Sequence, residues 1–238
     1  MEPVPATSPV YAYLKRASMV DYPGHLAVVA FTSGCNFRCG FCHNAALLGA
    51  RRKGLPWSKL NDALQTFRAN WTDAVCVTGG EPTLWGDHLT VLVHFLRERG
   101  FLVKLDTNGS RPGVLERVLP LIDRISMDVK CSLQHYADFV HFGDSDAIAR
   151  SIALIKSSGT DHEFRTTVVP GFHTEEEMAR IGELVKGAQL FTMQPFLPRP
   201  DLPDPRLREI RRTSTVYLRQ LREILRDAAD RIEIRGCE

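Results

Sequence analysis

Residues 26–44 of this 238-residue chain read LAVVAFTSGCNFRCGFCHN. The first seven are apolar and rich in valine, and turn residues flank them, so they predict a buried strand. Cys35, Cys39 and Cys42 follow at once, with the spacing C-x3-C-x2-C. Three thiolates on one short loop can each hold one iron of a cubane [4Fe–4S] cluster. No fourth cysteine follows at ligand spacing, so we expect one iron to stay open for a substrate or cofactor.

A structural zinc site is the alternative interpretation of this loop, with His43 as the fourth ligand. Structural zinc usually takes its ligands from two separated pairs, whereas this loop supplies one compact triplet. The pattern therefore favours iron. The remaining cysteines, Cys76, Cys131 and Cys237, are scattered along the chain. We expect Cys76 to be a packed free thiol and Cys237 an ordinary thiol near the terminus, while Cys131, which follows Lys130, either packs or approaches the site.

Strand-like and helix-like segments alternate along the chain. Short apolar runs bounded by turn residues predict strands, and longer stretches with helical spacing predict helices. The expected strands are 26–32, 74–78, 101–106, 124–129, 164–169, 190–194 and 232–234, and the expected helices are 58–69, 87–99, 114–119, 146–157, 175–186 and 206–228.

This alternation predicts an α/β fold with a parallel sheet. About six βα units are too few for a closed barrel of eight. The pattern favours an incomplete (βα)6 TIM-like barrel, and a doubly wound sheet stays open as the alternative. We expect a loose N-terminal lead-in over residues 1–20 and one domain over 21–238, with its core at about 21–195 and a C-terminal helical segment at about 206–228.

Polar residues gather where the expected strands end. Gly79, Gly80 and Glu81 follow the second strand, where glycines can bring a ligand close to the backbone and a carboxylate can accept from an ammonium group. The third strand ends in Asp106-Thr107-Asn108, which in isolation is also typical of a simple turn. Asp128 and Lys130 end the fourth strand with alternate spacing, so both side chains should point to the same side. In parallel α/β folds this edge carries the chemistry.

These motifs together resemble the radical S-adenosylmethionine (SAM) superfamily, whose signature is C-x3-C-x2-C with an aromatic residue, here Phe41, before the last cysteine. The resemblance runs from about residue 21 to residue 194 and implies a partial barrel, a [4Fe–4S] cluster and SAM. In that family the open iron chelates the amino and carboxylate groups of SAM, and reduction of the cluster cleaves SAM to methionine and a 5′-deoxyadenosyl radical.

The resemblance also implies roles for individual residues. It places the cluster on Cys35, Cys39 and Cys42 and assigns the Gly-Gly-Glu motif to the SAM amino group. It places the aspartates and the threonine around the SAM carboxylate, where they help to hold a monovalent cation. Arg165 resembles a SAM-contacting arginine, and Gln194 lies where the family often has a histidine near the ribose. The residues implied to contact SAM are Phe41, Gly79, Gly80, Glu81, Asp106, Thr107, Asn108, Asp128, Lys130, Arg165 and Gln194.

Within the superfamily the chain resembles the activating enzymes of glycyl radical enzymes. The matching stretches are 20–24, the cysteine loop, 77–83, 106–109 and 127–130. This implies a radical SAM activase that installs a glycyl radical on a partner, most of all anaerobic ribonucleoside-triphosphate reductase, with electrons from a flavodoxin- or ferredoxin-type donor. The alternatives are a radical SAM enzyme acting on a small molecule, such as a 7-carboxy-7-deazaguanine synthase, and a non-catalytic iron–sulfur or zinc module, which would leave the strand-end residues unexplained.

The overall composition excludes several other classes. The formal net charge of +2 is unlike that of a nucleic-acid-binding protein. The N-terminal residues lack the apolar segment of a signal peptide, and no apolar window approaches the roughly 20 residues of a membrane span. We therefore expect a cytoplasmic protein without a nucleic-acid or membrane partner.

Overall fold

The structure is a computed structural model that describes residues 6–236. Its strands form a single sheet in the order of the chain, from β1 to β8. β1 pairs with β2 in antiparallel fashion and all other neighbours are parallel. The strands are β1 (Val10–Tyr13), β2 (Ala27–Thr32), β3 (Ala74–Gly79), β4 (Leu102–Thr107), β5 (Arg124–Asp128), β6 (Asp161–Val168), β7 (Ala188–Pro195) and β8 (Ala229–Ile234).

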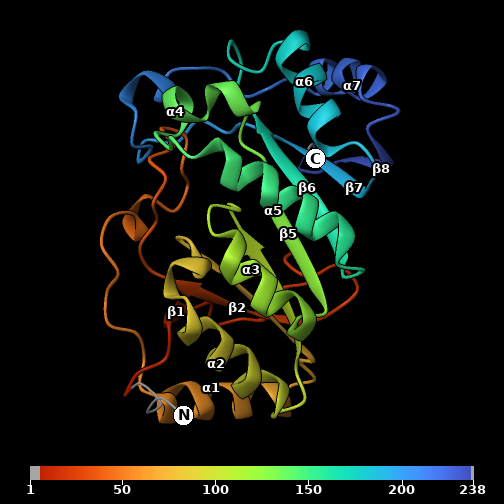
Figure 1. Ribbon diagram of the computed structural model, residues 1–238. Helices are drawn as coiled ribbons and strands as arrows, with labels where there is room; N and C mark the ends of the chain where they lie inside the picture. Colours follow the sequence, from red (N-terminus) through yellow and green to blue (C-terminus); the bar gives the residue numbers. More distant parts are fainter. Residues whose placement is uncertain (1–5, 237–238) are drawn as a thin grey trace.

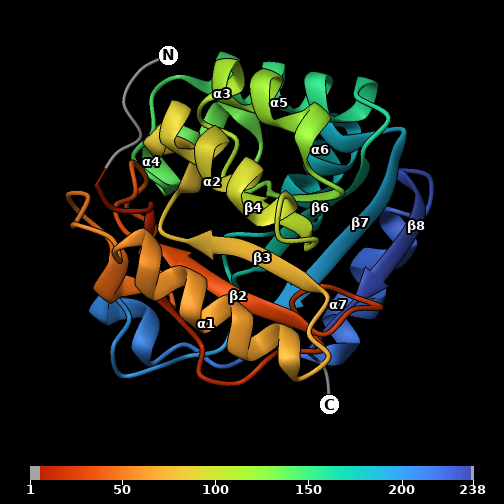
Figure 2. The same ribbon diagram turned by 90° about the horizontal axis from the view of Figure 1, so that it is seen from below.

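The sheet curves into a barrel that does not close, because no pairing joins β1 to β8 in the described part of the chain. Each strand from β2 to β7 is followed by a helix on the outer face (Figures 1 and 2). The helices are α1 (Trp57–Ala69), α2 (Asp87–Arg97), α3 (Pro112–Val118), α4 (Tyr136–Phe139), α5 (Ser145–Ser157), α6 (Glu175–Val185) and α7 (Thr215–Ile224). The expected six βα units and incomplete barrel are thus confirmed.

The two faces of the sheet differ in chemistry because side chains alternate along each strand. On the outer face, apolar strand residues such as Ile125 and Met127 join the helices in one continuous hydrophobic core. On the inner face, Arg124, Ser126 and Asp128 point toward charged partners on neighbouring strands. The stability of the fold therefore resides mainly in the outer layer, and the interior of the barrel is free to carry polar groups.

The N-terminal part of the chain differs from the expected lead-in. Val10–Tyr13 forms β1 at the edge of the sheet, and the amide of Ser8 donates to the carbonyl of Leu55. This part therefore belongs to the domain, although residues 1–5 lie outside the described residues. A strand of four residues is too short for a periodic pattern to predict it.

The long C-terminal helix expected over residues 206–228 is wrong. The chain instead forms a short 3-10 helix at Pro205–Arg208 and then α7, which begins after Ser214 as N-cap. Buried Thr213 donates its hydroxyl to the carbonyl of Val168 and accepts from the amide of Phe196. These two bonds hold the chain against the ends of β6 and β7, so no helix can run through this point. The last strand is longer than expected, because β8 spans six residues and five of them pair with β7.

A search of the helices among residues 6–236 finds none that is both long and apolar enough to cross a membrane.

Candidate active site

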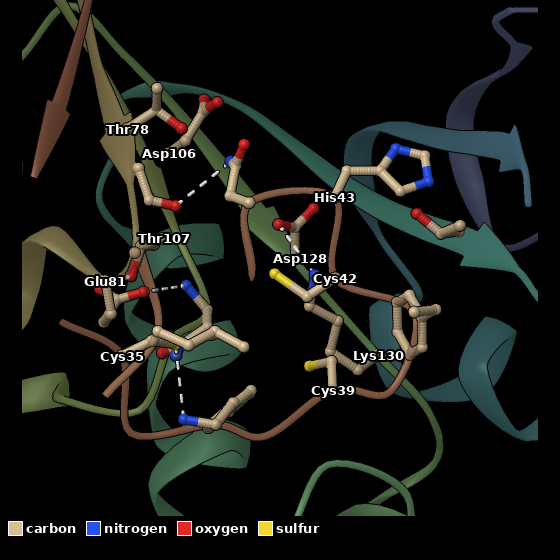
Figure 3. Close-up of a pocket in the computed structure, with 18 of the residues that line it drawn as sticks. Cys35, Cys39, Cys42, His43, Thr78, Glu81, Asp106, Thr107, Asp128 and Lys130 are labelled. Atoms are coloured by element: carbon tan, nitrogen blue, oxygen red, sulfur yellow. Dashed lines mark hydrogen bonds and ion pairs between the residues drawn. The ribbon is translucent and has the colours of Figure 1, made fainter. Parts of the chain in front are cut away.

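A cavity of about 270 Å³ opens at the carboxyl ends of the parallel strands (Figure 3). It brings together every residue that the sequence assigned to a site. These are Cys35, Cys39, Phe41, Cys42, Gly79, Gly80, Glu81, Asp106, Thr107, Asn108, Asp128, Lys130, Arg165 and Gln194. What each of these residues can bind depends on the contacts that its side chain already makes.

The cysteine loop follows β2 directly and is anchored by aromatic side chains. Phe37 is buried and packs against Tyr136 and Phe142, while Phe41 is buried against Phe139. Cys35, Cys39 and Cys42 line the cavity (Figure 3). The sulfur of Cys35 also accepts from the backbone amide of Phe37 at 3.4 Å. Such amide donors stabilise a thiolate, and therefore suit a metal-bound cysteine better than a packed thiol.

Burial controls the protonation of the three thiols. It raises the pKa of Cys35 to about 11, with a further contribution from the Glu81 carboxylate, and it raises the pKa of Cys39 to about 12. Burial also raises the pKa of Cys42. The free thiols are therefore protonated at neutral pH, and iron must displace three protons when it binds. The compact triplet of soft ligands fits an iron–sulfur cluster, whose irons each take one thiolate.

His43 is not placed to act as the fourth ligand of a zinc ion. The Nε2 atom of His43 lies 3.0 Å from the carbonyl oxygen of Leu197, and the ring is turned away from the sulfurs (Figure 3). Within residues 6–236 no three His, Cys, Asp or Glu side chains are placed so that they could hold one metal ion together. As the described side chains are placed, the loop therefore does not form a tetrahedral site for a single ion.

The two glycines of the Gly-Gly-Glu turn allow its backbone to lie directly against the backbone at the start of the cysteine loop. We expected them to admit a ligand, but a Cβ atom on Gly80 would lie 2.1 Å from the carbonyl oxygen of Gly34. Gly79 has a φ of 119° and its Cβ would meet the backbone of Thr32 at 2.3 Å. The amide of Gly80 donates to Thr32 at 3.0 Å and that of Glu81 to Gly34 at 2.7 Å. The glycines therefore join this turn to the start of the cysteine loop as well as lining the cavity.

Glu81 is fully buried and already has four hydrogen-bond donors. The amide and hydroxyl of Thr83, the hydroxyl of Thr107 and the amide of Asn108 all donate to its carboxylate. Burial raises the pKa of Glu81 and these bonds oppose the rise. Three of these donors reach Oε1 and only the amide of Asn108 reaches Oε2, so Oε2 keeps an acceptor position. The side chain ties the turn after β3 to the turn after β4, and its expected role toward a ligand's ammonium group stays a prediction.

Asn108 extends the same connection to the cysteine loop. Its Nδ2 atom lies 3.1 Å from Oδ1 of Asn36 and 3.8 Å from the sulfur of Cys35. The hydroxyl of Ser110 donates to the same oxygen of Asn36 at 3.2 Å. The turn after β4 therefore supports the loop that carries the thiols.

A guanidinium group lies between the two strand-end aspartates. Nη2 of Arg165 is 3.3 Å from Asp106, and Nε is 3.1 Å from Asp128. Lys130 pairs with the other oxygen of Asp128 at 3.1 Å. Burial alone would raise the pKa of Asp128, but Arg165 and Lys130 outweigh it and lower the pKa to about 2. The monovalent cation implied by the resemblance does not fit here, because Arg165 occupies the position between the carboxylates and the hydroxyl of Thr107 is bound to Glu81.

Lys104 completes this set of charges and was missed by the sequence analysis. It is 1% exposed, on the inner face of β4, and its ammonium group pairs with Asp106. Thr78, Thr167, Asn44 and Leu48 also line the cavity without having been predicted. The alternation of side chains along a strand could have identified Lys104 and Thr167. Lys104 lies two residues before Asp106, and Thr167 lies two residues after Arg165.

The comparison with family models decides the family. The model described as "Radical SAM superfamily" matches residues 29–185, most of the chain. The chain belongs to the radical SAM superfamily. It is therefore a radical SAM enzyme, and the cofactors of the family are a [4Fe–4S] cluster and SAM, as the sequence predicted.

Two relatives illustrate the range of the superfamily around this chain. A protein of Methanocaldococcus jannaschii described as "Putative glycyl-radical enzyme activating enzyme" is 33% identical over 225 residues, covering 92% of each chain. The pyruvate formate-lyase-activating enzyme of Streptococcus mutans is 27% identical over 193 residues, covering 74% of this chain and 73% of the relative.

Solved radical SAM structures share the fold. SuiB of Streptococcus suis bound to S-adenosylmethionine has a TM-score of 0.66 at 16% identity, covering 86% of this chain and 48% of SuiB. A domain of the pyruvate-formate lyase-activating enzyme of Bacteroides vulgatus has a TM-score of 0.55 at 17% identity, covering 69% of this chain and 99% of the domain. At these identities the likeness concerns the fold alone.

Proposed function

We propose that this radical SAM enzyme activates a glycyl radical enzyme, and that the partner is anaerobic ribonucleoside-triphosphate reductase. The observation that carries the activase role is the 33% identity to the M. jannaschii protein along 92% of both chains. The choice of partner rests on the subgroup resemblance of the sequence. We place the reaction in the cytoplasm, where thiols are kept reduced, with a flavodoxin- or ferredoxin-type protein as electron donor.

In this proposal Cys35, Cys39 and Cys42 hold the cluster, and SAM occupies the rest of the cavity. When bound, the cluster and SAM supply the reductive cleavage that gives methionine and a 5′-deoxyadenosyl radical. The chain contributes the position and the electrostatics. Phe41 and Phe37 hold the loop from behind, and Asn108 supports it beside Cys35.

The charges of the inner face suit a substrate that carries a carboxylate. Two cations line the cavity: Arg165 contacts Asp106 and Asp128, and Lys130 contacts Asp128. Burial lowers the pKa of Lys130, but Asp128 outweighs it and keeps the ammonium group charged. Its pairing with Asp128 takes one of the three donors of this group, so Lys130 keeps donors for the carboxylate of SAM. Charge-assisted hydrogen bonds of this kind are strong in a buried site.

The size of the cavity favours a macromolecular substrate. Ligand pockets enclose roughly 300–1,000 Å³, and this one holds about 270 Å³ and is lined by the residues assigned to the two cofactors. Little enclosed space is left for a second small molecule. An extended glycine loop of the partner would reach the cavity and cover it at the same time, which keeps water away from a reactive radical.

A small-molecule activity is the second candidate. The 7-carboxy-7-deazaguanine synthase of Methanopyrus kandleri is 31% identical over 153 residues, but this match covers 54% of this chain and 58% of the relative. The shorter match lends less support than the one along almost the whole chain.

The test is to incubate the reconstituted, reduced protein with SAM and a candidate anaerobic reductase under strict exclusion of oxygen. A glycyl doublet in the electron paramagnetic resonance spectrum that needs all three components supports the proposal. A reductase with its radical glycine replaced by alanine is the matched control and should give no doublet. If no glycyl radical enzyme gives the signal while a deazapurine precursor is turned over with SAM cleavage, the second candidate replaces the first.

A further inference from the structure

A second cavity lies on the other side of the cysteine loop. It encloses about 750 Å³, and we call it the rear groove. Its floor is the loop itself, and its walls are α4 with the residues after it, the turn after β6, and the segment after β7. The residues that matter below are Arg38, Gly40, Phe41, Phe139, Phe172 and Arg206. In Figure 1 the blue segment after β7 runs beside α4 above the cysteine loop.

A single backbone segment, the cysteine loop, separates the rear groove from the active-site cavity. Phe41 lines both. Gly40 lies between two of the cysteines, and its carbonyl accepts from the amide of Asp204 at 3.1 Å. A Cβ atom on Gly40 would lie 2.8 Å from the Cβ of Asp204. The loop is thus thin here because glycine lets the outer segment lie directly against it.

A stack of three aromatic rings joins the groove to the loop. The ring of Phe41 stacks on Phe139 at 5.2 Å with an interplanar angle of 27°. Phe139 stacks on Phe172 at 3.6 Å and 6°. Phe41 is buried, whereas Phe139 and Phe172 are partly exposed and line the groove. The groove therefore offers a partner an apolar, aromatic surface that continues to the residue beside Cys42.

The charges around this surface are mainly positive. Arg38 is exposed and has no ion-pair partner within residues 6–236. Residues 206–212 continue from the wall of the groove and carry four arginines and one glutamate. Asp138 and Asp204 also line the groove, but Asp204 is paired with Arg206 at 2.8 Å. The groove lining itself carries two arginines and two aspartates. The positive excess comes from Arg208, Arg211 and Arg212 of the adjoining segment, which is exposed, and it favours an acidic partner.

We propose that the rear groove is the docking site of an acidic one-electron carrier protein that reduces the cluster through the cysteine loop. This rests on the proposed function, in which SAM and the glycine loop of the substrate enzyme fill the front cavity. A reductant therefore needs another approach, and the rear groove provides one with a single layer of chain to cross. In the step the carrier loses one electron and the cluster gains it, and no bond is made or broken.

The experiment uses the reconstituted holoenzyme and measures how fast the visible absorbance of the cluster is bleached, without SAM or substrate enzyme. The probes are an acidic flavodoxin in its hydroquinone form and, separately, dithionite. Arg38→Glu and Arg206→Glu should each slow reduction by flavodoxin roughly tenfold and leave reduction by dithionite unchanged. Reduction of the unaltered protein by flavodoxin should also slow as ionic strength rises.

Arg150→Glu is the matched control, because it makes the same charge change at an exposed arginine of α5 outside the groove. The proposal is overturned if the groove variants slow flavodoxin no more than Arg150→Glu does. It is also overturned if they slow dithionite equally, since the cluster itself would then be altered. A second assay adds SAM and a candidate reductase: if dithionite then gives no glycyl radical even with the unaltered protein, the proposed function fails instead. If the groove variants suppress the glycyl radical with dithionite as reductant, the groove binds the substrate enzyme and not the carrier.

Discussion

The two faces of the sheet differ in chemistry: the outer face is apolar and the inner face is charged. On the outer face of the sheet, Leu89, Leu92, Val93 and Leu96 of α2 are at most 1% exposed and share one hydrophobic core with apolar strand residues. On the inner face, Lys104, Asp106, Asp128, Lys130 and Arg165 alternate in charge and touch one another. The difference shows that a barrel of six βα units can carry paired charges in its interior, because the hydrophobic core lies between the sheet and the helices.

The largest expected effect comes from the loop above the inner face. Cys39→Ala should abolish SAM cleavage and lower the iron content, because one iron would lose its ligand. The measurement is anaerobic reconstitution followed by iron analysis and a cleavage assay. Cys76→Ser is the control, since Cys76 is buried within β3 on the inner face and has no assigned role. Full activity of the Cys39 variant would show that the cluster assignment is wrong.

The next effect tests the charges of the inner face. Arg165→Met should weaken SAM binding about tenfold to a hundredfold, since a charged hydrogen-bonding group contributes about 1.5–3 kcal/mol. It should also lower the free energy of unfolding, because Asp106 and Asp128 would be left without their shared cation. Arg165→Lys should recover part of the affinity. Unchanged SAM affinity in a well-folded Arg165→Met protein, measured by calorimetry with iron content as control, would contradict the assigned role.

A change in the hydrophobic outer layer should lower the stability of the fold and leave SAM binding unchanged. Leu92→Ala should lower the free energy of unfolding by about 2–5 kcal/mol, because it leaves a cavity in the core. The affinity for SAM should stay within about twofold of the unaltered protein, since no charge changes near the site. Urea unfolding and SAM titration of the same sample measure both quantities. A large loss of SAM affinity would mean that the two faces are more closely coupled than their contacts indicate.

The smallest effect concerns His173, a buried residue between the turns after β5 and β6. Its Nε2 atom lies 2.9 Å from the carbonyl oxygen of Lys130, and the amide of Val169 donates to Nδ1 at 2.9 Å. Burial lowers the pKa of His173 from 6.5 to about 4. Between these values the unfolded chain binds a proton that the folded chain does not, so stability should fall as the pH drops from about 6.5 to about 4.

The pH prediction has a specific control. His173→Gln keeps a donor and an acceptor but cannot titrate, so the fall in the free energy of unfolding over this pH range should become smaller. Urea unfolding at several pH values measures it. An identical pH dependence in both proteins would show that other groups cause it.

Sequence reasoning succeeded where chemistry and strand ends coincide. The cysteine spacing and the residues after four apolar runs were enough to collect the lining of the cavity, because parallel strands end at one edge. It could not foresee which partners those residues take. Glu81 was expected to bind a ligand, and its bonds to Thr83, Thr107 and Asn108 were not foreseen, because only the folded chain brings the last two close.

The errors in the fold have similar causes. The apolar spacing of residues 206–228 continues through a point where the chain is tied down by Thr213, and periodicity carries no information about such long-range bonds. β1 was missed because four residues at a sheet edge give too short a pattern. Lys104 was overlooked although it lies two residues before Asp106 on the same strand, and the two side chains pair on the inner face.

The hydrogen bonds from Gly80 to Thr32 and from Glu81 to Gly34 have a consequence for protein engineering. They extend the parallel pairing of β2 with β3 beyond the strands, so the cysteine loop and the Gly-Gly-Glu turn form one cassette. Transplanting residues 33–44 alone into another barrel would leave the loop without its partner strand and without the bare backbone at Gly80. A portable version of this cluster loop would have to include residues 78–83 as well, in the same register.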